Sequence, residues 1–449
     1  MGSLVVIKQG RFRLNRTANN GRPLGPTSDE NQEAHDLAND DSALGTSQFP
    51  EGGYEAWFVV IGSFCALFMV FGMSSSTAVF QDYFSSHQLR EYSAAQIAWI
   101  FSLNLFLVFF GGIFSGRVFD AYGPRLLVTL GTLALVLSMM LLEFCTKYWH
   151  FMLIYAVLGG SGGALLMTPA FASIGHFFQR RHGLAAGIAN TSGAIGGIII
   201  PLLMRSLLPK IGFAWSSRVL GFLFLGLAIP ANIFIKKRLP PLKPTTSVIP
   251  DMTALKEINF ALCCAGMFFM EWGFFVPLSY ISSYATSHGQ GASFGYTIVA
   301  LMNAGSFFGR WIPGILADRL GRFNIIILTI SLCVITTLTL WLPAGNSKAL
   351  LVVFAIAFGF SSGSNLGLIP ACLSQLCRVE DYGRFFSTSY CLTSFATLTS
   401  LPIGGQLLTA AGGAYWGLIV FTGMSYIVAL IFYTASRVTT VGWKPKTFF

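Results

Sequence analysis

A chain of 449 residues in which 54% are hydrophobic and only 10% are charged is too poor in charge for a water-soluble domain, since such domains carry roughly 25% charged residues. In a soluble protein, a net charge of +10 would indicate that the protein binds nucleic acid. In an apolar membrane chain, basic residues gather on cytoplasmic loops instead, so no nucleic-acid partner is expected. The eight Cys show no metal-ligand spacing, and neither a metal nor a cofactor is expected.

Residues 1–50 are polar and of mixed charge, which predicts a disordered cytoplasmic tail. Beyond them, long stretches without charged residues recur along the chain. Because a helix needs about 20 apolar residues to cross a bilayer, these stretches predict an all-α membrane protein with twelve transmembrane helices. The expected spans are 57–80, 95–115, 126–145, 151–173, 184–204, 218–235, 258–284, 294–315, 324–343, 349–372, 387–409 and 414–436.

Lys and Arg are distributed unevenly between the two sides of these spans. With the N-terminal tail in the cytoplasm, sixteen fall on inside loops and six on outside loops or span ends, apart from five in the tail itself. This asymmetry favours both termini in the cytoplasm and an even number of spans.

A basic, proline-containing segment at 236–257 divides the spans into two groups and predicts a cytoplasmic linker. The expected organisation is a six-helix half at 51–235, the linker, a second six-helix half at 258–436 and a cytoplasmic tail at 437–449.

The two halves repeat short motifs at nearly the same offset. Residues 116–125 read GRVFDAYGPR and residues 314–322 read GILADRLGR, with aspartates 198 positions apart. A second pair, PAFAS at 169–173 and PACLS at 370–374, is offset by 201 positions. Such duplication is how many transporters are built, with the solute bound between the halves near the middle of the bilayer.

The charged residues of these loops form a candidate cytoplasmic latch. The aspartates can satisfy amides at a neighbouring helix end and pair with arginines, so the cluster could hold one side shut in one state. The alternative is ordinary positive-inside charge around a tight turn. The latch candidates are Asp120, Arg125, Arg180, Arg181, Asp318, Arg319 and Arg322.

At these loops the sequence resembles the major facilitator superfamily, whose signature between spans 2 and 3 is G-x-x-x-D-R-x-G-R-R. It is also similar to the monocarboxylate transporter family, in particular its fungal branch. EGGYEAW at 51–57 and FFQRRHGLAAG at 177–187 carry that similarity. The resemblance implies the major facilitator fold and secondary transport of a small organic solute.

The chain departs from lactate-carrying members of that family at two positions. They have a Lys late in span 1, where Ser75 stands here, and an Asp one turn before the Arg of span 8, where Ser306 stands here. Arg310 matches that Arg. These departures argue against lactate-type proton symport.

Two charges lie well inside expected spans, Glu271 in span 7 and Arg310 in span 8. A buried charge costs about 2–3 kcal/mol or more, so each is a functional candidate, the alternative being an ion pair between the two. Arg310 suits a carboxylate, and Glu271, if desolvated beside the cavity, would be the proton-coupling residue. Further substrate-binding candidates are Asn303, Ser306, Asn365, Ser75 and Asn104.

The expected function is secondary active transport of a small organic solute, a carboxylate or a secondary metabolite, by alternating access and with protons as a candidate coupling ion. The alternative is a transporter-like receptor that senses solute without net transport. The absence of a phosphate-binding G-x-x-x-x-G-K-[ST] loop argues against direct ATP drive, and no enzymatic activity is expected. The expected partners are the solute and membrane lipid, and the expected location is the plasma membrane, with an organelle membrane as the alternative.

Overall fold

The computed structural model describes residues 52–178, 182–238, 252–377 and 382–442, without the side chains of some residues inside these ranges. All the described helices belong to one compact unit, Glu51–Phe449. The expected tail at 1–50, the middle of the expected linker and the last seven residues lie outside the described residues. The regular elements of the described ranges are helices, as the apolar composition predicts.

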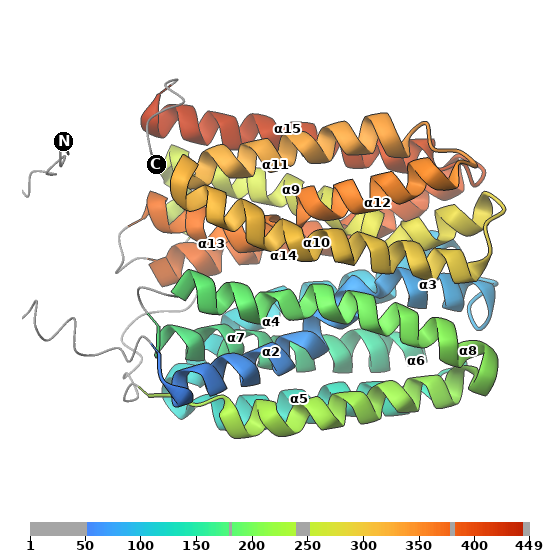
Figure 1. Cartoon of the computed structure of the whole chain (residues 1–449), viewed down its shortest axis with the longest axis horizontal. Coiled ribbons are helices and arrows are strands. Elements are labelled where there is room, and N and C mark those ends of the chain that lie inside the picture. The colour runs from blue at the N-terminus through green and yellow to red at the C-terminus, as the bar shows by residue number, and fades with distance from the viewer. Residues whose placement is uncertain (1–51, 179–181, 239–251, 378–381, 443–449) are drawn as a thin grey trace, which may run out of the picture. The chain divides into compact units, whose positions relative to one another are not determined.

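The first half of the unit runs from Tyr54 to Phe234 (Figure 1). Its elements form six passes, two of them within α8 (His182–Phe234). Several passes are built from two or three consecutive helical segments, which the structure separates at local irregularities. The elements are α2 (Tyr54–Ser75), α3 (Thr77–Ser86), α4 (Ala94–Tyr122), α5 (Pro124–Leu141), η1 (Leu142–Phe144), α6 (Tyr148–Phe151), η2 (Met152–Gly159), α7 (Gly160–Gly175) and α8 (His182–Phe234).

The long element α8 contains two passes that turn at Gly212. This residue has φ 72° and ψ 177°, a combination that is essentially restricted to glycine. The chain therefore reverses there without a separate loop, and the expected spans 5 and 6 are the two arms of α8.

The second half repeats the arrangement with six more passes. Its elements are η3 (Met252–Lys256), α9 (Ile258–Ser287), α10 (Ala292–Leu320), α11 (Arg322–Thr336), η4 (Thr337–Trp341), α12 (Lys348–Gly363), α13 (Asn365–Leu376), α14 (Tyr382–Ala410) and α15 (Trp416–Val441). The duplicated motifs have duplicated geometry: Gly123 separates α4 from α5 with φ 79°, and Gly321 separates α10 from α11 with φ 91°.

Nine stretches of the described chain are long and apolar enough to cross a membrane, and one of them, Leu184–Phe234, holds both arms of α8. The helices α10 and α14, with 29 residues each, are also long enough to cross a membrane, but polar side chains lower their hydropathy. Helix α10 contains Arg310, and α14 contains nine Ser and Thr residues. Counting these, the described chain makes twelve passes. It enters α2 and leaves α15 at the same end of the bundle (Figure 1).

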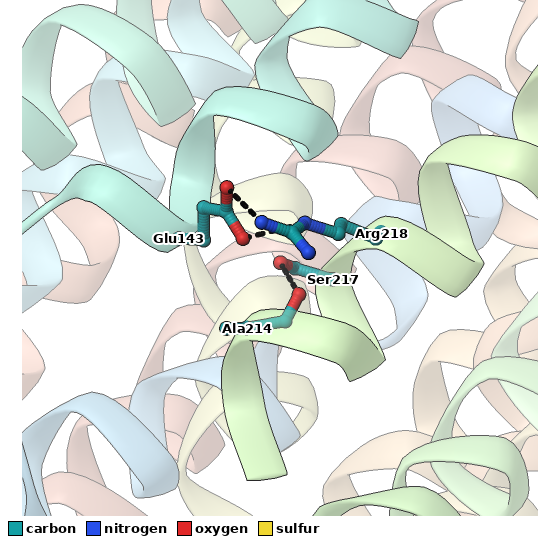
Figure 2. A network of polar contacts seen from close by, with 4 residues as sticks. All are labelled: Glu143, Ala214, Ser217 and Arg218. Atoms are coloured by element: carbon teal, nitrogen blue, oxygen red, sulfur yellow. Dashed lines mark hydrogen bonds and ion pairs between the residues drawn. The ribbon is translucent and has the colours of Figure 1, made fainter. Parts of the chain in front are cut away.

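An ion pair joins the third and sixth passes inside the first half (Figure 2). Arg218 contacts Glu143 at two points along one guanidinium edge, Nε to Oε2 and Nη2 to Oε1, each at 2.7 Å. The Arg218 guanidinium also lies 4.6 Å from the centre of the Trp215 ring. Next to it, Ser217 donates a hydrogen bond to the carbonyl of Ala214, on the turn of α8 that follows Gly212. This two-point contact fixes η1 against the second arm of α8.

Candidate functional site

A small cavity lies where the two halves meet at the centre of the bundle. Its volume is about 20 Å³, which is enough for about one water molecule. This cavity is too small for an organic solute, so binding one here requires the lining helices of the two halves to separate. The lining residues are Phe71, Ser74 and Ser75 of α2; Leu105, Val108 and Phe109 of α4; Phe274, Phe275 and Leu278 of α9; and Arg310 of α10.

Arg310 brings a positive charge to this cavity. Its Nη1 donates a hydrogen bond to the backbone carbonyl of Asn190, in the first arm of α8. Its Nε is buried and has no hydrogen-bond partner among the described residues. No carboxylate of the described ranges lies within ion-pair distance of it. The guanidinium thus retains donor capacity that a carboxylate of a bound solute would satisfy.

Two glycines of α8 make room for two polar side chains of α10. A Cβ placed on Gly193 would lie 3.1 Å from Nη1 of Arg310, and a Cβ on Gly197 would overlap the amide of Asn303. The glycines are one helical turn apart, and the side chains they accommodate are two turns apart on α10. The absence of side chains at these positions therefore allows α8 and α10 to approach closely where the cavity is formed.

Ser75 and Asn303 are joined across the interface between the halves. Asn303 donates to the backbone carbonyl of Ser75 at 3.3 Å, and to that of Val299 in its own helix at 2.9 Å. The first pass is interrupted at this level, because α2 ends at Ser75 and α3 begins at Thr77. Interrupted helices near the middle of the membrane are a common feature of transporter binding sites.

The hydroxyl run of α2 also bonds to its own helix. Ser74 donates to the carbonyl of Val70 at 3.1 Å, and Ser76 to that of Gly72 at 2.8 Å. Such bonds satisfy hydroxyls in an apolar environment and often bend helices. Of this run, Ser74 and Ser75 reach the central cavity.

Other candidates lie apart from this centre. Ser306 packs against α12, because a Cβ on Gly363 would lie 3.1 Å from its hydroxyl. Asn104 donates to the carbonyl of Tyr155 at 2.9 Å and lines a second cavity, of about 10 Å³, inside the first half. Asn365 is fully buried, and neither of its amide atoms has a hydrogen-bond partner in the described part of the chain.

Glu271 lies inside the second half and does not line the central cavity. Its side chain is fully buried, and neither carboxyl oxygen has a hydrogen-bond partner among the described residues. Tyr426 and Tyr433 of α15 lie close enough to interact electrostatically with it, and Tyr426 is also beside Asn365. The alternative in which Glu271 pairs with Arg310 does not hold in this conformation, since no ion pair joins them.

The latch candidates are described only in part. Arg180 and Arg181 lie outside the described residues, as do the side chains of Asp120 and Asp318, although both aspartates are in helices. Arg125 and Arg319 are exposed, and Arg322 is partly buried. The latch stays a prediction.

Sequence reasoning did not find the aromatic walls of the cavity. Phe71, Phe109, Phe274 and Phe275 line it, but nothing in a chain with 42 Phe distinguishes them from residues facing lipid. The close approach of α8 and α10 was also missed. The pair Gly193 and Gly197, at helical spacing, was the available signal.

Two six-helix repeats that meet around a buried arginine define a membrane transporter rather than an enzyme. The chain belongs to the Major Facilitator Superfamily, whose family model matches residues 56–384. The expected fold and family are thereby confirmed.

The similar curated proteins are fungal transporters of this family. The MFS-type transporter opdF of Penicillium oxalicum is 36% identical, over 89% of this chain and 94% of its own length. The riboflavin transporter MCH5 of Saccharomyces cerevisiae is 35% identical, over 90% and 82%. The aspyridones efflux protein apdF of Emericella nidulans is 34% identical, over 81% and 74%.

Among solved structures, the nucleoside transporter NupG, in a mutant form, superposes with a TM-score of 0.68. The match covers 84% of this chain and 99% of NupG at 13% identity. At that identity the similarity establishes the fold alone.

Proposed function

We propose that this transporter moves a small organic solute bearing a carboxyl or other anionic group, by alternating access between its two halves. The observation that carries the proposal is the environment of Arg310: a cation at the central cavity with a buried, unpartnered Nε and no acidic partner among the described residues. Arg binds carboxylates through two parallel hydrogen bonds, so an anionic solute would satisfy it.

The rest of the solute is expected to be apolar and to contain a ring. Four Phe side chains line the cavity beside Arg310, and aromatic rings favour stacked or edge-on contacts with other rings. One relative is named for the transport of riboflavin, a ring compound, and another for the efflux of aspyridones. We therefore infer a secondary metabolite, exported across the plasma membrane, as the favoured cargo.

Alternating access requires contacts that form at one side while those at the other side break. The links between Arg310 and Asn190 and between Asn303 and Ser75 join the halves in the closed conformation. On the cytoplasmic side, the latch residues Asp120, Arg125, Arg180, Arg181, Asp318, Arg319 and Arg322 would take the corresponding role in the opposite state.

Proton coupling is assigned to Glu271 as part of the same proposal. A carboxyl buried among tyrosines without a countercharge is most stable in its neutral form. A change in its surroundings as the second half moves would let it release the proton. Since Glu271 lies away from the cavity, the coupling would act through the packing of α9 against α15 rather than through contact with the solute.

The second candidate is a solute-sensing receptor without net transport. A small central cavity is compatible with a receptor, because a receptor and a transporter would both bind a solute between the halves. Flux distinguishes them: a receptor binds without moving solute into or out of sealed vesicles.

The test is a screen of organic acids and ring-bearing metabolites in vesicles from a transporter-deficient host. Wild type is compared with Arg310→Ala and with Lys210→Ala, which removes an exposed cation of α8. The proposal is supported if an anionic solute is transported by wild type and by Lys210→Ala but not by Arg310→Ala. Equal flux in all three proteins contradicts it. Saturable binding without flux favours the receptor.

A further inference from the structure

An acidic side chain joins the two halves near one end of their interface. Asp82, in α3 of the first half, accepts hydrogen bonds from two hydroxyls of α9 in the second half. Ser282 donates to Oδ2 at 3.2 Å and Thr286 to Oδ1 at 3.4 Å. Each carboxyl oxygen therefore contacts the opposite half. We refer to Asp82, Ser282 and Thr286 as the outer clasp.

The clasp lies at the end of the bundle that the distribution of Lys and Arg assigns to the outside. α3 follows α2 at the end remote from the point where the chain enters α2. Another link between the halves, Arg205 Nη1 to the hydroxyl of Thr297 at 3.0 Å, joins α8 to α10 near the start of α10. Separating the halves on this side must break the contacts of Asp82.

The surroundings of Asp82 contain no basic side chain of the described ranges at ion-pair distance. The titratable groups near it are His87 and Tyr83 of its own segment, Tyr296 of α10 and Tyr415, which precedes α15. Burial raises the pKa of Asp82, because its effect exceeds the opposite effects of the Ser282 and Thr286 hydroxyls and of His87.

We propose that Asp82 is a proton-binding site that controls the outer clasp. Closing the outer side transfers a proton from the external solution to the Asp82 carboxylate, and opening returns the proton to that solution. The neutral carboxyl tolerates burial between the halves, where Ser282 and Thr286 contact it, whereas the charged carboxylate favours the hydrated, open state. This inference goes beyond the proposed function and holds whichever solute is carried.

The sign of the pH effect follows from linkage. The pKa of Asp82 is raised in the closed state and returns toward its ordinary value of 3.8 once water reaches it. The closed state then binds the proton more tightly, so acid favours closure. The preference for the closed state is complete when the external pH is below the ordinary pKa of Asp82. It disappears as the external pH rises through the raised pKa of the closed state.

Ser279 provides a reporter of opening that requires no solute. It lies on α9 one turn deeper than Ser282, on the same face as Thr286, and is 1% exposed. A Ser279→Cys thiol would react with a membrane-impermeant maleimide only when the outer side is open. Ser293→Cys, at an exposed position at the start of α10, corrects for the effect of pH on thiol reactivity.

The native thiols interfere little with this assay. Seven of the eight cysteines are buried, and the eighth is intermediate. Cys145 lies between two spans, and burial raises the pKa of its thiol to about 12, so it contains little reactive thiolate. Labelling of the unaltered chain is subtracted as background.

The expected result is that normalised labelling of Ser279→Cys rises about threefold or more as the external pH rises from about 5 to about 7.5. Adding Asp82→Asn, which mimics the neutral carboxyl, makes labelling low at every pH. Adding Asp82→Ala, which removes the bridge, makes it high at every pH. Glu91→Gln, which neutralises an exposed acid near α3, leaves the pH response unchanged.

Two results would overturn the proposal. One is labelling that does not vary with external pH in the Ser279→Cys chain. The other is a pH response that persists in Asp82→Asn. Surface abundance of each variant, measured on the same membranes, separates a folding defect from a change in the clasp.

Discussion

The guanidinium of Arg310, in the eighth pass, donates a hydrogen bond to the backbone carbonyl of Asn190, in the fifth. This contact joins the two halves through a residue that is also the cation of the central cavity. A solute carboxylate would compete with that carbonyl for the same donor. Binding and opening are therefore expected to be linked, because the solute replaces a contact that holds the halves together.

Both the charge and the forked geometry of Arg310 are expected to contribute to solute affinity. Arg310→Gln removes a charge-assisted hydrogen bond, which costs about 1.5–3 kcal/mol and corresponds to about a ten- to hundredfold loss of solute affinity. Arg310→Lys keeps the charge but loses the forked geometry, so an intermediate loss is expected. Initial rates at varied solute concentration measure both effects. A lysine variant with wild-type kinetics would show that only the charge matters.

The glycine contacts between α8 and α10 are expected to be sensitive to one added methyl group. A Cβ in Gly197→Ala overlaps the Asn303 amide, which must move and lose its bond to Ser75. We expect a loss of about 1–3 kcal/mol in stability, seen as a lower Tm, together with slower transport. Gly187→Ala is the matched control, because a Cβ at Gly187 meets no atom within 4 Å.

A double variant separates steric conflict from a general effect on the helix. Asn303→Ala in the Gly197→Ala background removes the overlapping amide, so the two changes should cost less together than the sum of their separate costs. If the stability losses of the two substitutions were strictly additive, the overlap between position 197 and the Asn303 amide would not be the cause of the loss in Gly197→Ala.

Neutralising Glu271 is expected to uncouple protons from solute. Glu271→Gln has nearly the same volume but cannot exchange a proton, so solute accumulation driven by a pH gradient should be lost. Exchange of labelled for unlabelled solute across the membrane should persist, because Glu271 does not line the cavity. Glu91→Gln serves as the control. Unchanged gradient-driven accumulation in Glu271→Gln would exclude the coupling role.

The ion pair between Glu143 and Arg218 is expected to contribute to stability and not to transport specificity. Glu143 is 7% exposed and Arg218 35%, so the contact is only partly screened by water. Glu143→Gln should cost about 1–2 kcal/mol, measured as a lower Tm in detergent. Lys210→Gln, which removes an exposed charge of α8, the helix that contains Arg218, should leave the Tm unchanged. Equal effects of the two substitutions would count against a specific contact.

Much of the architecture followed from sequence because hydropathy and charge are local properties that a bilayer constrains. Twelve passes and the repeat could be predicted, whereas the positive φ of Gly123 and Gly321 in the repeated motifs came from the structure. The expected pass at 184–204 could be located, but its continuation into the next pass through Gly212 could not, since it depends on one backbone conformation. The candidate site was predicted only in part, because residue type does not reveal which face of a helix meets the opposite half.

The sequence by itself determined the membrane fold, the duplication and the rarity of buried charge, which singled out Arg310 and Glu271. Tertiary structure decided that Arg310 lies at the interface between the halves and Glu271 inside one of them. It also brought Asp82 to Ser282, 200 residues away. The physical reason is that bilayer thickness limits how a chain can cross the membrane, whereas the face each helix turns to its neighbours depends on close packing of side chains that are distant in sequence.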